Sequence, residues 1–334
     1  GIISQQEMVR GQVALRHHVL GKVPLFNIEN ACASGGSAFS LACEAVASGA
    51  VEVALVVGAE QMNHVDRSRP FNALRGSTDI EEIGESEPGQ ISANSLLMDF
   101  YAAVAQRYLD ESGAELSDFA RVAVKNRKNA TMNLLAHLRT PQSLEDVLAS
   151  RMIVAPLSLP MCSPVTDGAA AIIVCSDKVG ASIGHPVVQV KASAGASGAS
   201  GNPVGDAAAK AYTDSSVGSQ DFDVIELHDA AAPAELMQYH EIGLCAKGDG
   251  FRLIRDGVTD LGGATPVNTS GGLLSRGHPL GATGCAQIVE LVHQLRGTAG
   301  ARQVEGARLA LAVNGGGWLD GTYALAIATV LARS

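Results

Sequence analysis

The pattern that most constrains the fold occurs twice, once in each half of the chain. A reactive side chain is followed by small residues, a helix-forming segment and an apolar strand that ends in glycine. Cys32 precedes the strand predicted over 51–59, and His278 precedes the strand predicted over 308–313. In α/β folds, strand ends and helix starts line the ligand site. Two related halves would therefore bring Cys32 and His278 to one central site.

The length and composition favour a large α/β protein. The chain has 334 residues, which is enough for two packed units or one large α/β domain. Its 37 glycines and 4% aromatic content predict a core built from small aliphatic residues. The formal net charge of −10, with no lysine-rich block, argues against a nucleic acid partner. An anionic ligand would need a local basic patch.

The six cysteines are scattered and form no CxxC pair. This spacing predicts reduced thiols rather than a disulfide framework or a metal site. No apolar run approaches membrane-spanning length and no segment resembles a signal peptide, so we expect a cytoplasmic protein without a membrane partner. The chain opens at Gly1 without an initiating Met, as if upstream residues were missing.

The pattern along the chain predicts where helices and strands alternate. A short strand over 22–28 leads into Cys32, and residues 62–95 form a polar loop excursion. A capping pattern at Ser143 opens a short helix. Further segments are assigned from their periodicity: helices within 1–20 and over 95–112, 116–137 and 285–295, and strands near 169–174, 223–227, 308–313 and 324–331.

Cys32 lies on a tight turn that leads into a predicted helix N-terminus. Unpaired N–H groups and the helix dipole favour negative charge there, so the thiol is expected to lose its proton more easily than a free cysteine. The thiolate is the nucleophilic form. The alternative is that Cys32 is one more small buried residue of the core.

Two histidines are candidates for the proton transfer that a nucleophilic thiol needs. His278 lies in a glycine-rich loop, where close approach to a ligand is possible. His228 directly follows a predicted strand, although it could simply be held by a loop hydrogen bond. The run from Asn314 to Gly317 could present N–H groups to an oxyanion or could be a plain turn.

Together, these motifs make the chain resemble the thiolase superfamily, and within it the sterol-carrier/lipid-transfer branch. The matching segments cover nearly the whole chain in the expected order: 30–35 (Asn-Ala-Cys-Ala-Ser-Gly), 226–229 (Glu-Leu-His-Asp), 266–272, 277–284 (Gly-His-Pro-Leu-Gly-Ala-Thr-Gly) and 314–317 (Asn-Gly-Gly-Gly).

The resemblance implies an α/β fold with two related βαβαβαββ halves in five layers (αβαβα) and a loop-domain insertion. The N-terminal half would comprise 1–61 and 161–183, without the family's opening strand–helix unit. The loop domain would span 62–160 and the C-terminal half 184–334. The family further implies a homodimer or a dimer of dimers.

The resemblance also implies the roles of the site residues. Cys32 would be the acylated nucleophile, His278 its activator and His228 part of an oxyanion hole. Backbone groups at Asn314, Gly315 and Gly316 would complete a second hole.

The implied substrate is coenzyme A or an acyl-CoA, with no permanently bound cofactor and no metal. Candidate substrate-binding residues are Arg67 and Lys125, as basic residues of the loop domain, and Ser270 and Gly271 of the 266–272 motif.

Two departures from the family pattern leave three functions open. Asn314 and Ala230 occupy the positions where the family carries a second cysteine, and Cys285 is expected in the core. Asparagine cannot transfer a proton at neutral pH. The chain could be an acyl-CoA acyltransferase, a retro-aldol lyase of steroid-like acyl-CoA with an OB-fold partner, or a non-catalytic acyl-CoA-binding protein.

Overall fold

The structure is a computed structural model that describes residues 8–83, 96–184 and 186–334. Two β-sheets position the elements that matter for function. The first pairs β1 (Val53–Glu60) with β4 (Gly168–Cys175) in antiparallel register. The second has the strand order β5-β8-β7-β6. Its strands are β5 (Val188–Ser197), β6 (Val224–Glu226), β7 (Leu309–Gly316) and β8 (Leu325–Arg333).

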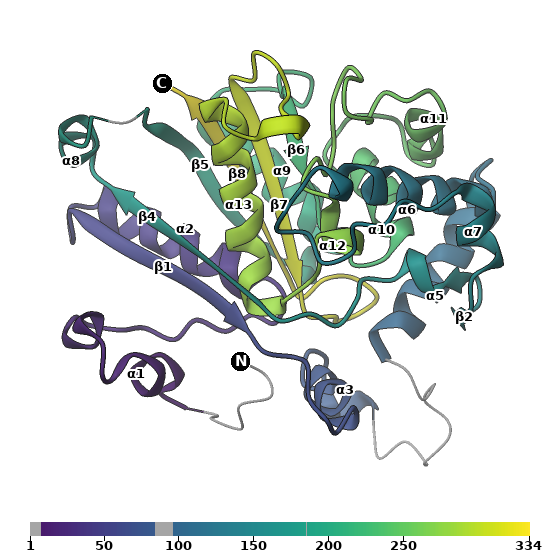
Figure 1. The fold of residues 1–334 in the computed structure, drawn as a ribbon, viewed down its shortest axis with the longest axis horizontal. Coiled ribbons are helices and arrows are strands. Elements are labelled where there is room, and N and C mark those ends of the chain that lie inside the picture. The colour runs from purple at the N-terminus through teal and green to yellow at the C-terminus, as the bar shows by residue number, and fades with distance from the viewer. Residues whose placement is uncertain (1–7, 84–95, 185) are drawn as a thin grey trace.

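Two helices form a layer between the sheets. The helices α2 (Ser34–Ala47) and α13 (Leu280–Arg296) pack against each other and against strands of both sheets, and Figure 1 shows α13 running between β4 and β7. Small residues allow this close packing. A side chain on Gly58 of β1 would place its Cβ 2.4 Å from the carbonyl oxygen of Gly281.

The layer order in the described residues is sheet, helices, sheet, helix. The helix α9 (Pro203–Ser215) covers the other face of β5 and β8. On the outer face of β1 and β4, Val53, Leu55 and Ile173 are exposed. The described part of the chain therefore forms four of the five expected layers, and the fifth remains a prediction.

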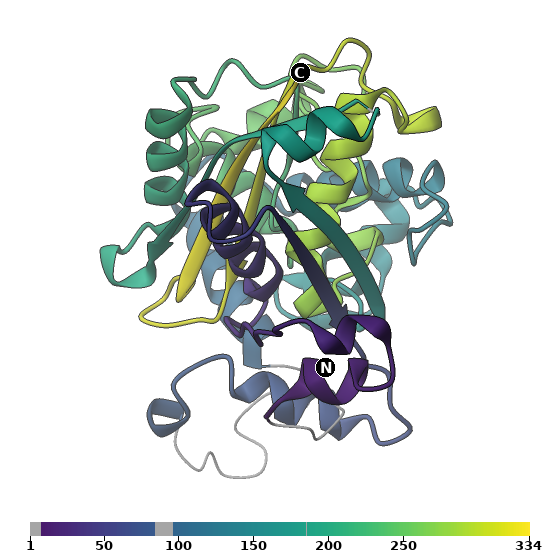
Figure 2. The same cartoon turned by 90° about the vertical axis from the view of Figure 1, so that its left-hand side faces the viewer.

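The expected internal repeat is visible as a helix followed by two antiparallel strands. In one half this unit is α2, β1 and β4, and in the other it is α13, β7 and β8 (Figures 1 and 2). Residues 317–324 connect β7 to β8, whereas 61–167 lie between β1 and β4. This longer connection contains α3 (Ser68–Arg75), α4 (Ile80–Ile83), α5 (Leu96–Glu111), α6 (Leu116–Thr131), α7 (Leu144–Ala149), β2 (Met152–Val154) and β3 (Leu157–Ser158).

The remaining elements are short or lie near the C-terminal sheet: α1 (Arg10–Leu15), α8 (Asp177–Ser182), α10 (Ala232–Glu241), α11 (Gly250–Arg255), α12 (Gly272–Ser275), and the 3₁₀ turns η2 (Val19–Lys22), η3 (Leu159–Met161), η4 (Gly198–Ser200) and η5 (Gly300–Arg302). In the described part of the chain, we find no helix that combines the length and the apolar character needed to cross a bilayer.

Several predicted boundaries are wrong. Residues 22–28 form no strand, and Phe26 is 85% exposed instead of packed in a sheet. The loop predicted over 62–95 contains α3 and α4; residues 84–95 lie outside the described part. The helix predicted from Cys285 already begins at Leu280, because the glycines of this segment fit against neighbouring backbone. Asn314 to Gly316 continue β7 rather than form a turn.

Candidate active site

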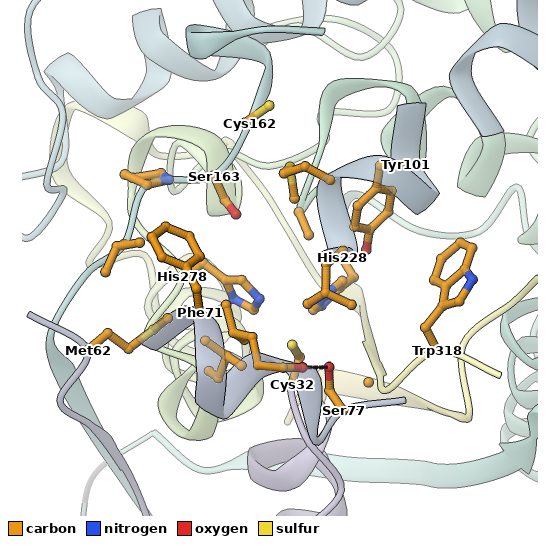
Figure 3. Close-up of a pocket in the computed structure, with 18 of the residues that line it drawn as sticks. Cys32, Met62, Phe71, Ser77, Tyr101, Cys162, Ser163, His228, His278 and Trp318 are labelled. Carbon is orange, nitrogen blue, oxygen red and sulfur yellow. Dashed lines mark hydrogen bonds between the residues drawn. The ribbon is translucent and has the colours of Figure 1, made fainter. Parts of the chain in front are cut away.

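Cys32, His228 and His278 converge on one buried point. One side-chain ligand atom from each lies within 4.8 Å of the other two. Cys32 lies just before α2, His228 just after β6 and His278 just before α13. Figure 3 shows the three side chains near one another among the residues that line one pocket. Residues from both halves of the chain thus meet as their positions in the two repeats predicted.

The turn before α2 is held by local hydrogen bonds. The hydroxyl of Ser34 accepts from the backbone N–H of Asn30 at 2.9 Å and donates to the carbonyl oxygen of Ala31 at 2.6 Å. Ala31 adopts a left-handed conformation with φ of 48°. This sharp turn directs Cys32 into the molecule, where only 7% of the residue is exposed.

Burial decides the protonation of Cys32. Removal from water raises the pKa of the thiol to about 12, and the nearby carboxylates of Glu60 and Glu29 act in the same direction. The backbone N–H of Cys32 opposes this, but more weakly. The prediction of an easily ionised thiol is therefore wrong. The thiol is protonated and needs a base when it reacts.

His278 is placed to be that base. Its Nδ1 lies 2.7 Å from the hydroxyl oxygen of Thr283, and this hydroxyl donates its proton to the carbonyl oxygen of Pro279 at 3.1 Å. The hydroxyl must then accept from Nδ1–H, which leaves Nε2 of His278 as the unprotonated nitrogen. Burial, aided by Arg276, lowers the pKa of His278 to about 3, so the ring stays neutral at neutral pH.

His228 is held through its backbone. The side chain of Gln238 accepts from the N–H of His228 at 3.0 Å and donates to its carbonyl oxygen at 2.8 Å. The ring meets that of His278 edge to face, with centroids 5.1 Å apart. Burial, followed by the neighbouring His278, holds the pKa of His228 well below its usual value. Both imidazoles are therefore neutral.

Strand β7 supplies the wall opposite the nucleophile. The amide of Asn314 lies between Cys32 and His228, with its Nδ2 3.1 Å from the carbonyl oxygen of Cys32. Gly316 lines the cavity, whereas Gly315 packs on the ring of Tyr323, so of the two predicted glycines only Gly316 faces the reacting groups.

A cavity of about 220 Å³ opens from the three catalytic candidates. Most of its wall is apolar, including Phe71, Leu74, Met98, Ile153, Leu159 and Trp318. Trp318 stacks on Phe100 with centroids 5.5 Å apart and meets Tyr101 and Tyr323 edge to face. Such a wall suits the apolar part of an acyl group.

Arg67 lies beside this cavity. It lines an adjoining hollow that shares Met62, Phe71 and Val165 with the cavity, and its side chain is exposed. A basic group at this place could meet an anionic part of a ligand outside the apolar chamber.

The other three predicted substrate-binding residues are part of the interior. The ammonium of Lys125 forms a buried ion pair with Glu235 and donates to the carbonyl oxygen of Val267. The hydroxyl of Ser270 donates to Glu226 at 2.6 Å, and Gly271 packs against α6. Since none of the three lines either cavity, their placement supports a structural role instead of substrate contact.

Two further cysteines are relevant to the missing second thiol. Cys285 is fully buried, and its thiol lies 3.7 Å from the carbonyl oxygen of Gly35, so its prediction as a core residue is confirmed. Cys162 lines the cavity but lies at its other end from Cys32 (Figure 3). Among the described residues that line the cavity, Cys32 is thus the only thiol beside the two histidines.

Some residues of the site could not be found from the sequence. Gln238 lies ten positions after His228, whose backbone it binds, and nothing in the helical pattern around Gln238 distinguishes it from its neighbours. Thr283 follows His278 by five positions in the glycine-rich motif, and a hydroxyl within reach of a histidine was the available clue.

Comparison with known proteins finds thiolase matches over most of the chain. The family "Thiolase, N-terminal domain" matches residues 3–139 and "Thiolase C-terminal domain-like" matches 190–329. The benzoylsuccinyl-CoA thiolase subunit BbsB of Thauera aromatica is 37% identical, over 93% of this chain and 81% of its own length. The acetyl-CoA acetyltransferase of Methanothermobacter thermautotrophicus is 38% identical, over 98% and 85%.

Two further similarities concern the lipid-transfer branch. Human sterol carrier protein 2 is 34% identical over 91% of this chain, which spans 58% of that protein's length. The solved structure "Ltp2-ChsH2(DUF35) aldolase" superposes with a TM-score of 0.74 at 28% identity, covering 91% of this chain and 78% of that one.

Proposed function

Because this chain belongs to the thiolase family, we propose that it is an acyl-CoA C-acyltransferase that works through an acyl-Cys32 intermediate. The matches confirm the α/β thiolase fold and the resemblance to the sterol-carrier branch. The observation that carries the proposed mechanism is the convergence of one thiol and two neutral imidazoles at the end of an apolar cavity.

The proposed reaction begins when an acyl-CoA fills the cavity. The sulfur of Cys32 attacks the thioester carbonyl carbon while Nε2 of His278 takes the thiol proton. Donors near the carbonyl, among them the ring of His228 and backbone N–H groups around Cys32 and Gly316, stabilise the oxyanion. The bond to the coenzyme A sulfur then breaks, and His278 returns the proton to the departing thiolate.

The protonation states support this order of events. Because the pKa of Cys32 is raised to about 12, its thiol is almost entirely protonated at neutral pH and reacts slowly with electrophiles in solution. With its pKa lowered to about 3, the ring of His278 is unprotonated throughout the neutral range, so Nε2 can accept the thiol proton as the bond from sulfur to the carbonyl carbon forms and the thiol becomes more acidic. A carbon nucleophile or free coenzyme A would then accept the acyl group from Cys32.

A second candidate function is retro-aldol cleavage of an acyl-CoA. Two observations favour it: the similarity to a solved structure named as an aldolase, and an asparagine at position 314, which cannot carry a proton between carbon centres. That structure's name joins two proteins, and BbsB is named as a subunit. The small OB-fold partner that the resemblance implies for such lyases belongs to this second candidate.

The remaining sequence-based assignments are kept as proposals. The loop domain at 62–160 would cover the coenzyme A tail, with Arg67 beside it. The N-terminal half would be 1–61 with 161–183 and the C-terminal half 184–334. We also propose that the chain assembles as a homodimer or a dimer of dimers and is located in the cytoplasm. The relatives named as acetyltransferase and thiolase support an enzyme over a mere acyl-CoA-binding protein.

Intact mass spectrometry tests the proposal. After incubation with acetyl-CoA, the wild-type protein is expected to gain one acetyl group, located on Cys32 by peptide mapping. The Cys32→Ala variant should neither acetylate nor turn over. Cys43→Ala, which removes a thiol of α2 that does not line the cavity, is the matched control and should behave as wild type. Full turnover of Cys32→Ala would refute covalent catalysis.

Product analysis separates the two candidate reactions. Thiolysis of a 3-ketoacyl-CoA by free coenzyme A supports the acyltransferase. Cleavage of a 3-hydroxyacyl-CoA without coenzyme A, with or without an OB-fold partner, supports the lyase instead.

A further inference from the structure

The side-chain amide of Asn314 has only one orientation that fits its surroundings. On one side, the backbone N–H of Gly36 lies 3.2 Å from Oδ1 and can only donate. On the other side, the carbonyl oxygen of Cys32 lies 3.1 Å from Nδ2 and can only accept. Exchanging the amide oxygen and nitrogen would break both hydrogen bonds, so the two backbone groups fix which atom faces His228.

This orientation determines where His228 carries its proton. The Nδ2 of Asn314 lies 3.2 Å from Nδ1 of His228 and can only donate. Nδ1 must therefore be the unprotonated nitrogen, and in a neutral ring the proton is then on Nε2. We propose that Asn314 is a positioning residue that holds His228 as its Nε2–H tautomer, so that this ring donates a hydrogen bond to a thioester oxygen of the bound acyl-CoA.

The two neighbouring imidazoles thereby have different chemical roles, one as a base and the other as a hydrogen-bond donor. Thr283 makes Nδ1 of His278 the protonated nitrogen and leaves Nε2 as a base, whereas Asn314 makes Nδ1 of His228 the acceptor and leaves Nε2–H as a donor. Since both rings are buried, both are neutral before the reaction begins, and His278 becomes an imidazolium only while it holds the proton of Cys32. The base and the oxyanion donor are thus assigned by residues that do not themselves react.

The other contacts of His228 leave the tautomer open. Gln238 binds only its backbone, and the ring of Tyr323 meets it edge to face without a hydrogen bond to a ring nitrogen. A cysteine at position 314 could donate or accept and would fix neither tautomer. Asparagine therefore supplies a definite donor at the position where this chain lacks the second thiol.

The inference rests on the proposed acyl transfer for its catalytic meaning, but its test does not. In protein labelled with ¹⁵N-histidine, protonated and unprotonated ring nitrogens have distinct chemical shifts. The His228 signals are identified by their absence from the spectrum of His228→Gln. We expect a protonated Nε2 and an unprotonated Nδ1 in the wild-type protein. If Nδ1 of His228 is protonated in the wild-type protein, the inference is wrong, and this result needs no variant of Asn314.

The Asn314→Asp variant then tests the consequence for catalysis. Its carboxylate accepts from Nδ1–H, so the tautomer should reverse and Nε2 should present a lone pair to the oxyanion. Loss of such a donor lowers the turnover number by about 100- to 1,000-fold, with a much smaller change in KM. Asn314→Ala should show both tautomers and an intermediate rate.

Asn133→Asp is the matched control, because Asn133 is also buried and its amide donates to a backbone carbonyl, that of Ser270, away from the cavity. It should keep the His228 tautomer and the wild-type KM and turnover number. Asn314→Asp acting at the wild-type rate with a reversed tautomer would overturn the catalytic role. If the wild-type protein forms no acyl-Cys32, the proposed function fails, while the nitrogen shifts still decide the tautomer.

Discussion

A methyl group on Gly316 tests how strictly the position of the nucleophile depends on β7. A Cβ built on Gly316 would lie 2.2 Å from the backbone nitrogen of Ala33 and 2.3 Å from the carbonyl oxygen of Asn30. These atoms belong to the turn that carries Cys32. Real Cβ atoms essentially never come closer than 3.0 Å to such atoms. The turn or the strand must therefore retreat by about 1 Å.

The size of the effect follows from this displacement. Misplacing a reacting atom by about 1 Å can lower a rate by about 100-fold, so the Gly316→Ala variant should acylate Cys32 about 100 times more slowly than wild type. The same crowding should cost about 1–3 kcal/mol of unfolding free energy. The acylation rate is measured by intact mass against time under single-turnover conditions with acetyl-CoA, and the stability by chemical denaturation.

The matched control is Gly218→Ala. Gly218 is an exposed loop residue, and the nearest atom to its built Cβ is a carboxylate oxygen of Asp221 at 3.6 Å, an ordinary contact. This variant should acylate at the wild-type rate. If Gly316→Ala also acylates at the wild-type rate while remaining folded, the geometric coupling between β7 and Cys32 is refuted.

Three further predictions concern the base, the thiol and the buried ion pair. Thr283→Val leaves Nδ1–H of His278 without its acceptor and should slow acylation by about 10- to 100-fold, whereas the control Thr329→Val should not. An unchanged single-turnover rate in Thr283→Val would contradict the tautomer assigned to His278. Because burial raises the pKa of Cys32 to about 12, its alkylation by iodoacetamide should increase about tenfold per pH unit from about pH 7 to 10; peptide mapping that finds a plateau below about pH 9 would show an acidic thiol instead. Lys125→Met leaves Glu235 buried and unpaired and should lower the unfolding free energy by about 3–5 kcal/mol, whereas a raised KM for acyl-CoA at full stability would restore Lys125 as a substrate contact.

The sequence alone determined the family, the fold class and the three residues that meet at the site. Cys32 before a glycine turn, His228 after a strand and His278 in a glycine-rich loop are local patterns that can be recognised without coordinates. The same holds for the helix start at Ser143. The predicted cap is confirmed, because Ser143 and Asp146 exchange hydrogen bonds between the backbone N–H of each and the side chain of the other. Such features depend on residues a few positions apart, so their signal lies within one stretch of the chain.

Only the tertiary structure decided how these residues behave. The helix N-terminus suggested an acidic thiol at Cys32, but the surrounding protein removes water and raises its pKa. The positive charge of Lys125 suggested a ligand contact, but its partner Glu235 lies 110 positions away in the sequence. The contact between Asn314 and His228 spans 86 positions. Desolvation and long-range hydrogen bonds arise only when distant segments pack together, which is why the sequence located the site but not its protonation states.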